Sequence, residues 1–187
     1  MKRRKPLKPG GPIKRKPGKK KPKLSSVKAK PKKKTPKQRL EKEADKLMGK
    51  FIRGDGRCFF SGKVDFKPYG VTQNCHLERR SRSAAIKFSA LNGIPGDMTP
   101  HVKHDNSQLD WGVFLHKWMP GRAERLCAMK NWALAHSGLF VIEDVIRANI
   151  AWYKKMLDAE TYWWEWHHSG ACDDYIDPIE ALMEKLG

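Results

Sequence analysis

Apolar residues recur every three or four positions in the stretch that follows residue 35, with lysines and glutamates between them. On a helix, this spacing gathers the apolar side chains into one stripe. Thr35 followed by Pro36 suits a helix start, and the Gly-Asp-Gly run at 54–56 suits a helix end. We therefore predict a helix between these two signals, with an apolar stripe formed by Leu40, Ala44, Leu47, Met48 and Phe51.

Helical spacing returns in the second half of the chain. Residues 122–136 and 143–157 both carry apolar side chains at intervals of three and four. Asp177 followed by Pro178 has the form of an N-cap and first helical residue, and predicts a last helix that runs to Leu186. A further helix is expected after Pro100, extending toward Trp118.

The region between these helices has the pattern of short strands. The segments 58–60 and 63–66 flank Ser61-Gly62, which predicts a short strand, a turn and another strand. A third strand-like segment at 71–77 ends near Cys75 and His76. Residues 78–100 are rich in arginine, glycine and proline and are expected to be irregular. The predicted fold class is α+β: a mostly helical body around one small β region.

Charge divides the chain sharply. Residues 1–40 contain 19 Lys and Arg and no acid; the whole chain has 39 basic and 20 acidic residues, so 39 − 19 leaves 20 against 20 in the remainder. The leading segment is also rich in proline and poor in apolar residues, which predicts a disordered tail. The expected organisation is a disordered basic tail at 1–38, a region at 39–118 that carries the chemistry, and a C-terminal helical region at 119–187 packed on it.

A polycationic tail on a neutral body indicates a polyanionic partner, and we expect DNA bound through released counterions. The expected phosphate contacts in the tail include Lys14, Arg15, Lys16, Lys32, Lys33 and Lys34. No apolar run reaches the ~20 residues that a membrane span needs, so no membrane partner is expected. The four cysteines lack the spacing of a disulfide framework and indicate a reducing, intracellular location.

Histidine and cysteine gather in the β region, next to further arginines and oxygen ligands. His76 ends a strand-like segment, and His101 and His104 share one face if their stretch is helical. Cutting a phosphodiester needs a base that works near neutral pH and a cation that neutralises phosphate charge. These residue types therefore favour a metal-dependent nuclease, in which phosphate oxygens are bound by Arg79, Arg80 and Arg82.

Several segments resemble the phage NinG-type recombination proteins, which are similar to HNH, or ββα-metal, endonucleases. The resemblance covers roughly residues 1–115, and its motifs are a charged helix around 41–47, a knuckle at 56–63, a His segment at 75–80 and a last segment at 97–106. It implies an HNH-like DNA endonuclease of phage recombination or replication, located in the host bacterial cytoplasm. It also implies that hydrolysis leaves a 5′-phosphate and a 3′-hydroxyl.

The same resemblance assigns roles to residues. His76 stands at the general base, and Asp97 stands at the HNH asparagine that orients the base. The catalytic Mg²⁺ or Mn²⁺ would be held by His104, Asp105 or Asn106.

The knuckle positions leave two alternatives open. The first knuckle reads Cys58-x-x-Ser61 and the second His101-x-x-His104, so thiolates are missing from both. Cys58, Cys75, His101 and His104 form a Cys₂His₂ set that suits structural Zn²⁺, which predicts a non-catalytic nucleic-acid-binding protein. The other alternative is a degenerate site that binds no metal. The Trp-rich segment at 162–166 is interpreted as core packing or as a platform for unpaired bases, and the histidines at 167 and 168 as solvated surface.

Overall fold

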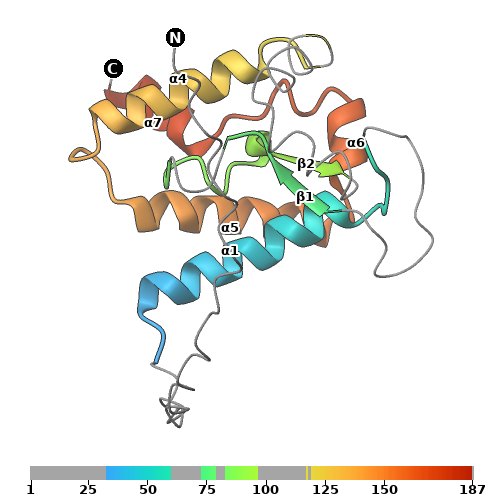
Figure 1. Cartoon of the computed structure of the whole chain (residues 1–187), viewed down its shortest axis with the longest axis horizontal. Coiled ribbons are helices and arrows are strands. Elements are labelled where there is room, and N and C mark those ends of the chain that lie inside the picture. The colour runs from blue at the N-terminus through green and yellow to red at the C-terminus, as the bar shows by residue number, and fades with distance from the viewer. Residues whose placement is uncertain (1–32, 60–72, 79–82, 97–116, 118, 187) are drawn as a thin grey trace, which may run out of the picture. The chain divides into compact units, whose positions relative to one another are not determined.

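The computed structural model of the chain describes residues 33–59, 73–78, 83–96, 117 and 119–186. The chain divides into two units, Met1–Lys33 and Lys34–Gly187, and the second contains all the secondary structure described below. Its elements are α1 (Pro36–Arg53), β1 (Gln73–His76), the 3₁₀ helix η1 (Ala90–Asn92), β2 (Gly93–Gly96), α4 (Arg122–Ala135), α5 (Ile142–Asp158), α6 (Trp163–His168) and α7 (Pro178–Leu186). Figure 1 shows the two strands between α1 on one side and α4 on the other. The architecture is therefore α+β and mostly helical, with a two-stranded antiparallel sheet.

The first helix forms where the sequence predicts it. The Thr35 hydroxyl accepts a hydrogen bond from the Gln38 amide N at 3.2 Å, and the Gln38 side chain accepts one from the Thr35 amide N at 3.0 Å. This reciprocal capping box satisfies two amides that a helix start leaves unpaired. The apolar stripe is buried at Ala44, Met48 and Phe51, each with no exposed area.

The core lies between α1 and α5, which run side by side, and it is strongly aromatic. The Phe51 ring lies 5.1 Å from Trp152, 5.5 Å from Tyr153 and 5.6 Å from Trp166, measured between ring centroids. Trp163 and Trp166 are only 0% and 2% exposed. The core-packing interpretation of the Trp-rich segment is therefore correct for these two residues.

The C-terminal helices α4, α5 and α7 also form where predicted. Asp177 caps α7, because its Oδ1 accepts from the Ile179 amide N at 2.9 Å while Glu180 Oε2 accepts from the Asp177 amide N at 2.9 Å. Arg125 of α4 pairs with the same Glu180 through two hydrogen bonds of 2.7 Å. This bidentate pair ties α4 to α7.

The sheet corrects one prediction and confirms another. β1 lies within the strand expected at 71–77, whereas β2 lies in a stretch predicted to be irregular because it contains two glycines and a proline. The register pairs Gln73 with Gly96, Asn74 with Pro95, Cys75 with Ile94 and His76 with Gly93. The Leu77 amide N donates to the Asn92 carbonyl at 3.0 Å, so these two residues form a hydrogen-bonded pair. Because bonded and non-bonded pairs alternate along antiparallel strands, Pro95 falls in a non-bonded pair, where its lack of an N–H removes no hydrogen bond to β1.

The outer edge of β2 is also used. The Phe59 amide N donates to the Pro95 carbonyl at 2.8 Å, so the chain around Cys58 lies along the edge of β2 opposite β1. The strand predicted at 58–60 is described only as far as Phe59, and the one at 63–66 lies outside the described residues. The helix predicted after Pro100 and the tail before residue 33 also lie outside them. Among the described helices, none has the length and apolar character needed to cross a membrane.

Candidate functional site

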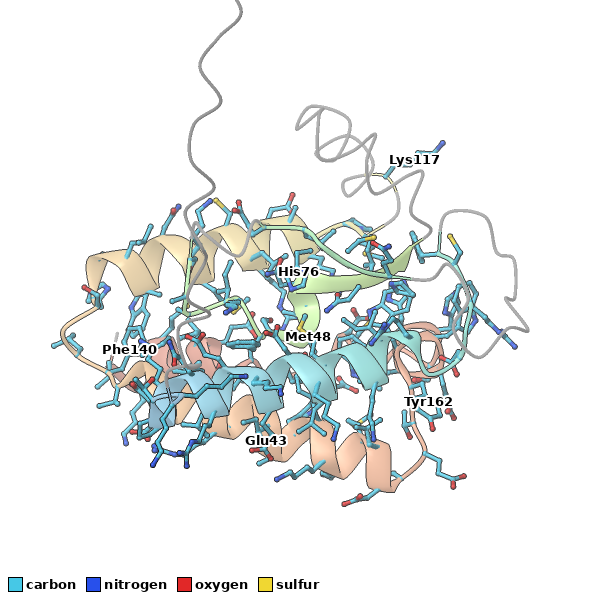
Figure 2. The ribbon with its side chains drawn as sticks, turned by 60° about the horizontal axis from the view of Figure 1, so that its bottom comes forward. Glu43, Met48, His76, Lys117, Phe140 and Tyr162 are labelled. Carbon is cyan, nitrogen blue, oxygen red and sulfur yellow. The ribbon has the colours of Figure 1, made fainter. Side chains whose placement is uncertain are left out.

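His76 is the last residue of β1 and is half-buried. Residues opposite one another in an antiparallel pair share a face of the sheet, so His76 lies on the same face as its partner Gly93. A Cβ at Gly93 would meet Ile52 Cδ1 at 2.1 Å and Met48 Cε at 2.8 Å, so this face is the one that packs on α1. Figure 2 shows His76 and Met48 close together at this junction.

Asn92 holds the chain directly after His76. Its Oδ1 accepts from the Glu78 amide N at 2.7 Å, and its Nδ2 donates to the carbonyls of Glu78 at 3.3 Å and Ile86 at 3.1 Å. The Asn92 side chain is 1% exposed, so each of these bonds forms away from water. Since buried polar groups are costly to leave unpaired, Asn92 fixes the exit from β1 as firmly as the strand pairing fixes its start.

A salt bridge anchors the same segment to α4. Lys130 Nζ lies 2.7 Å from Glu78 Oε1, and both side chains are largely buried. Glu78 is two residues after His76, so the backbone that carries the imidazole is held from β2 and from α4 together. The predicted base therefore lies on a rigid part of the fold, which suits a group that must hold its position.

Arg122 supports η1 and β2 from the opposite side. Its guanidinium is buried and donates to the carbonyls of Leu91 at 2.7 Å, Ala90 at 3.0 Å and Gly93 at 3.0 Å. Burial lowers the pKa of Arg122 to about 10, which still leaves it protonated at neutral pH. One cation thus satisfies the carbonyls of the turn that leads into β2.

Cys58 and Cys75 are each only 1% exposed. Cys75 packs within the main apolar core, and its thiol has a long contact of 3.9 Å to the Gln73 carbonyl. Successive strand residues point to opposite faces, so the Cys75 and His76 side chains are directed away from each other. None of the four cysteines, Cys58, Cys75, Cys127 and Cys172, forms a disulfide bond.

The described residues contain no group of three or more His, Cys, Asp and Glu side chains arranged to hold a metal ion. Lys33 and Lys34 are exposed, and their role in binding phosphate stays a prediction. The other predicted residues lie outside the described part of the chain, and their roles stay predictions: the catalytic Asp97, the ligands His101, His104, Asp105 and Asn106, and the phosphate contacts Lys14, Arg15, Lys16, Lys32, Arg79, Arg80 and Arg82.

The histidines of α6 correct another expectation. His168 is exposed, but His167 is half-buried and its ring stacks on Trp163 at a centroid distance of 4.8 Å. Burial, with the nearby Arg122 charge second, lowers the pKa of His167 to about 4. His167 is therefore a neutral packing residue at physiological pH rather than solvated surface.

Sequence reasoning missed Asn92 and Arg122, the two residues that hold this region together. Asn92 precedes a glycine, which is the signal of a turn, and nothing local indicates that its amide reaches back across the strands. Arg122 begins a helix whose pattern predicts only its apolar stripe. A comparison of the chain with known proteins found no matching family model, no matching curated protein and no matching solved structure.

Proposed function

We propose that this protein is a metal-dependent, HNH-like DNA endonuclease in which His76 is the general base. The observation that carries the proposal is the placement of His76 at the end of a strand, with the following backbone fixed by Asn92 and by the Lys130–Glu78 pair. An imidazole titrates near neutral pH and can take a proton from water. A base held this rigidly meets the requirement that a catalytic group keep its geometry.

The distances along the chain are compatible with this arrangement. β2 runs antiparallel to β1 and ends at Gly96, opposite Gln73. His76 is three residues further along β1 than Gln73, which places it about 10 Å from the level of Gly96 at about 3.3 Å per strand residue. His101 is five positions after Gly96, and five residues of extended chain span up to about 17 Å. The proposed ligands His101, His104, Asp105 and Asn106 can therefore come back to the level of His76.

In the proposed reaction, His76 deprotonates a water that attacks the phosphorus in line with the leaving oxygen. Mg²⁺ or Mn²⁺ held at residues 101–106 would supply charge neutralisation on the phosphate. Arg79, Arg80, Arg82 and the basic tail hold the DNA backbone. In addition to the predicted Asp97, we assign Asn92 as a positioning residue for the base, because its side chain hydrogen-bonds to both the amide N and the carbonyl of Glu78.

The test is nicking of supercoiled plasmid by the full chain with Mg²⁺, Mn²⁺ or Zn²⁺, and with EDTA as a control. His76→Ala should lower the rate by roughly 10²–10⁴-fold, the usual contribution of a general base. His168→Ala is the matched control, because it removes an exposed imidazole from α6 and should leave the rate unchanged. Nicking that persists in EDTA, or that is equal in the two variants, would overturn the assignment.

The burial of both Cys58 and Cys75 favours a second candidate function. Two shielded thiols, together with His101 and His104, would form a closed structural zinc site in a protein that binds nucleic acid without cutting it. Metal analysis of the purified protein distinguishes the two candidates. One Zn²⁺ per chain that is lost in Cys58→Ser, together with no nicking under any divalent ion, would favour this second function.

A further inference from the structure

The outer face of α1 carries a continuous line of positive charge. With 100° of rotation per residue, five basic residues fall within an arc of about 80°, on the side opposite the apolar stripe. All five are exposed, and at 1.5 Å per residue they extend over about 21 Å. We call this surface the basic stripe of α1, formed by Arg39, Lys42, Lys46, Lys50 and Arg53.

Two of the three acids of α1 pair with lysines outside this stripe. Glu41 pairs with Lys87 at 3.4 Å, and Glu43 pairs with Lys154 of α5 at 2.8 Å. Asp45 is half-buried, away from the exposed face. Figure 2 shows Glu43 and Met48 on opposite edges of α1.

The other long helix packed against α1, α5, mixes both signs of charge. α5 carries three acidic and three basic residues, whereas α1 carries six basic and three acidic residues. The acids of the body collect elsewhere: residues 158–187 contain eight acids and a single lysine. From Pro36 onward the chain has 22 basic and 20 acidic residues and is nearly neutral. It nevertheless has a basic helix and an acidic C-terminal segment, and such a separation orients a molecule in the field of a polyanion.

We infer that the basic stripe of α1 is a docking surface for the phosphate backbone of duplex DNA. A basic amphipathic helix can also lie on a membrane, but it must then bury its apolar face in lipid. Here Ala44, Met48 and Phe51 are already fully buried in the core. Proteins that bind single strands add aromatic stacking platforms, and the exposed face of α1 has none, because its one aromatic residue is Phe51.

The basic stripe of α1 extends the proposed function, because it adds DNA binding by the folded body to the binding expected of the tail and of the predicted arginines. It stands on charge geometry alone and needs no cleavage. Binding is therefore measured in EDTA, so that failure of the nuclease proposal and failure of this one give different results.

The experiment compares two paired variants of the full chain. Lys46→Gln with Lys50→Gln removes two charges from the stripe, and Lys155→Gln with Lys185→Gln removes two exposed charges from α5 and α7. Lysine and glutamine have nearly equal helix propensity, so both variants should fold. The affinity for a short fluorescent duplex is measured between about 50 and 200 mM salt.

The stripe variant should weaken duplex binding about tenfold or more, and should flatten the slope of log K against log salt by about 1.8, since each lost phosphate contact removes about 0.9. The control should bind like wild type. Equal weakening in both variants would overturn the inference in favour of net charge alone. No weakening in the stripe variant would overturn it outright. A larger loss on anionic vesicles or on single strands than on the duplex would assign the stripe to that other partner.

Discussion

Asp177 offers a direct test of what burial of a charge does to the stability of this fold. The carboxyl group is fully buried; its Oδ1 accepts from the Ile179 amide N and its Oδ2 from the Tyr175 hydroxyl at 3.3 Å. Burial raises the pKa of Asp177 from 3.8 to about 6, although hydrogen bonds from Ser89 and Ile179 favour the charged form. The native state therefore binds this proton more tightly than the unfolded chain does.

The sign of the effect follows from that difference. A raised native pKa stabilises the fold fully below the unfolded value of 3.8, and this contribution is lost as the pH rises through about 6. One pKa unit corresponds to about 1.4 kcal/mol. At neutral pH, the buried charge therefore leaves the protein about 3 kcal/mol less stable than it would be with the carboxyl protonated.

Asp177→Asn should remove this dependence. Asparagine caps a helix as well as aspartate does, and its amide oxygen can still accept from the Ile179 amide N. Urea unfolding of wild type and variant, at several pH values between about 4 and 7.5, should give a stability difference that moves in favour of the variant by about 3 kcal/mol as the pH rises. Asp174→Asn, at an exposed position, is the control. A difference that stays constant with pH would refute the reasoning.

Three further predictions concern the packing around the candidate site. Gly93→Ala should lower the free energy of unfolding by about 1–3 kcal/mol, because the new Cβ would lie 2.1 Å from Ile52 Cδ1. The control Gly138→Ala places its Cβ in open space and should melt like wild type. Equal melting temperatures of the two variants would contradict this prediction. Arg122→Lys should cost about 3 kcal/mol or more in urea unfolding, because a single ammonium nitrogen cannot occupy the positions of both Nε and Nη2, which together bond the three carbonyls. A loss below about 1 kcal/mol would show that these bonds contribute little. The depressed pKa of His167 contributes stability above about pH 6.5, and this contribution is lost as the pH falls toward 4. In His167→Gln, the melting temperature should therefore fall less steeply between pH 6.5 and 4 than in wild type. An unchanged pH dependence would rule out His167 as its source.

The helices could be predicted from the sequence because their signals are local. Thr35 and Pro36 mark the start of α1, and Asp177 and Pro178 mark the start of α7, with capping bonds that the sequence spacing already implies. The position of His76 at a strand end was also predictable, since β1 follows from its own apolar pattern.

The second strand could not be predicted, because its reasons lie outside its own residues. Gly93 is needed for the close approach of α1, and Pro95 is tolerated only because of the register opposite Asn74. Both residues indicate a turn when read locally. The bonds from Asn92 to Glu78 and from Arg122 to the carbonyls of residues 90–93 join segments that are 14 to 32 residues apart, and no local pattern reports such a distance.

The guanidinium of Arg122 has a consequence for how this protein can be dissected. The carbonyls it serves belong to residues 90–93, which lead into the strand paired with His76, whereas the arginine itself comes from the first turn of α4. A fragment truncated before α4 would leave those acceptors without their donor in a dry interior. The strands β1 and β2 therefore depend on α4, and a shortened version of this protein that is meant to fold must retain that helix.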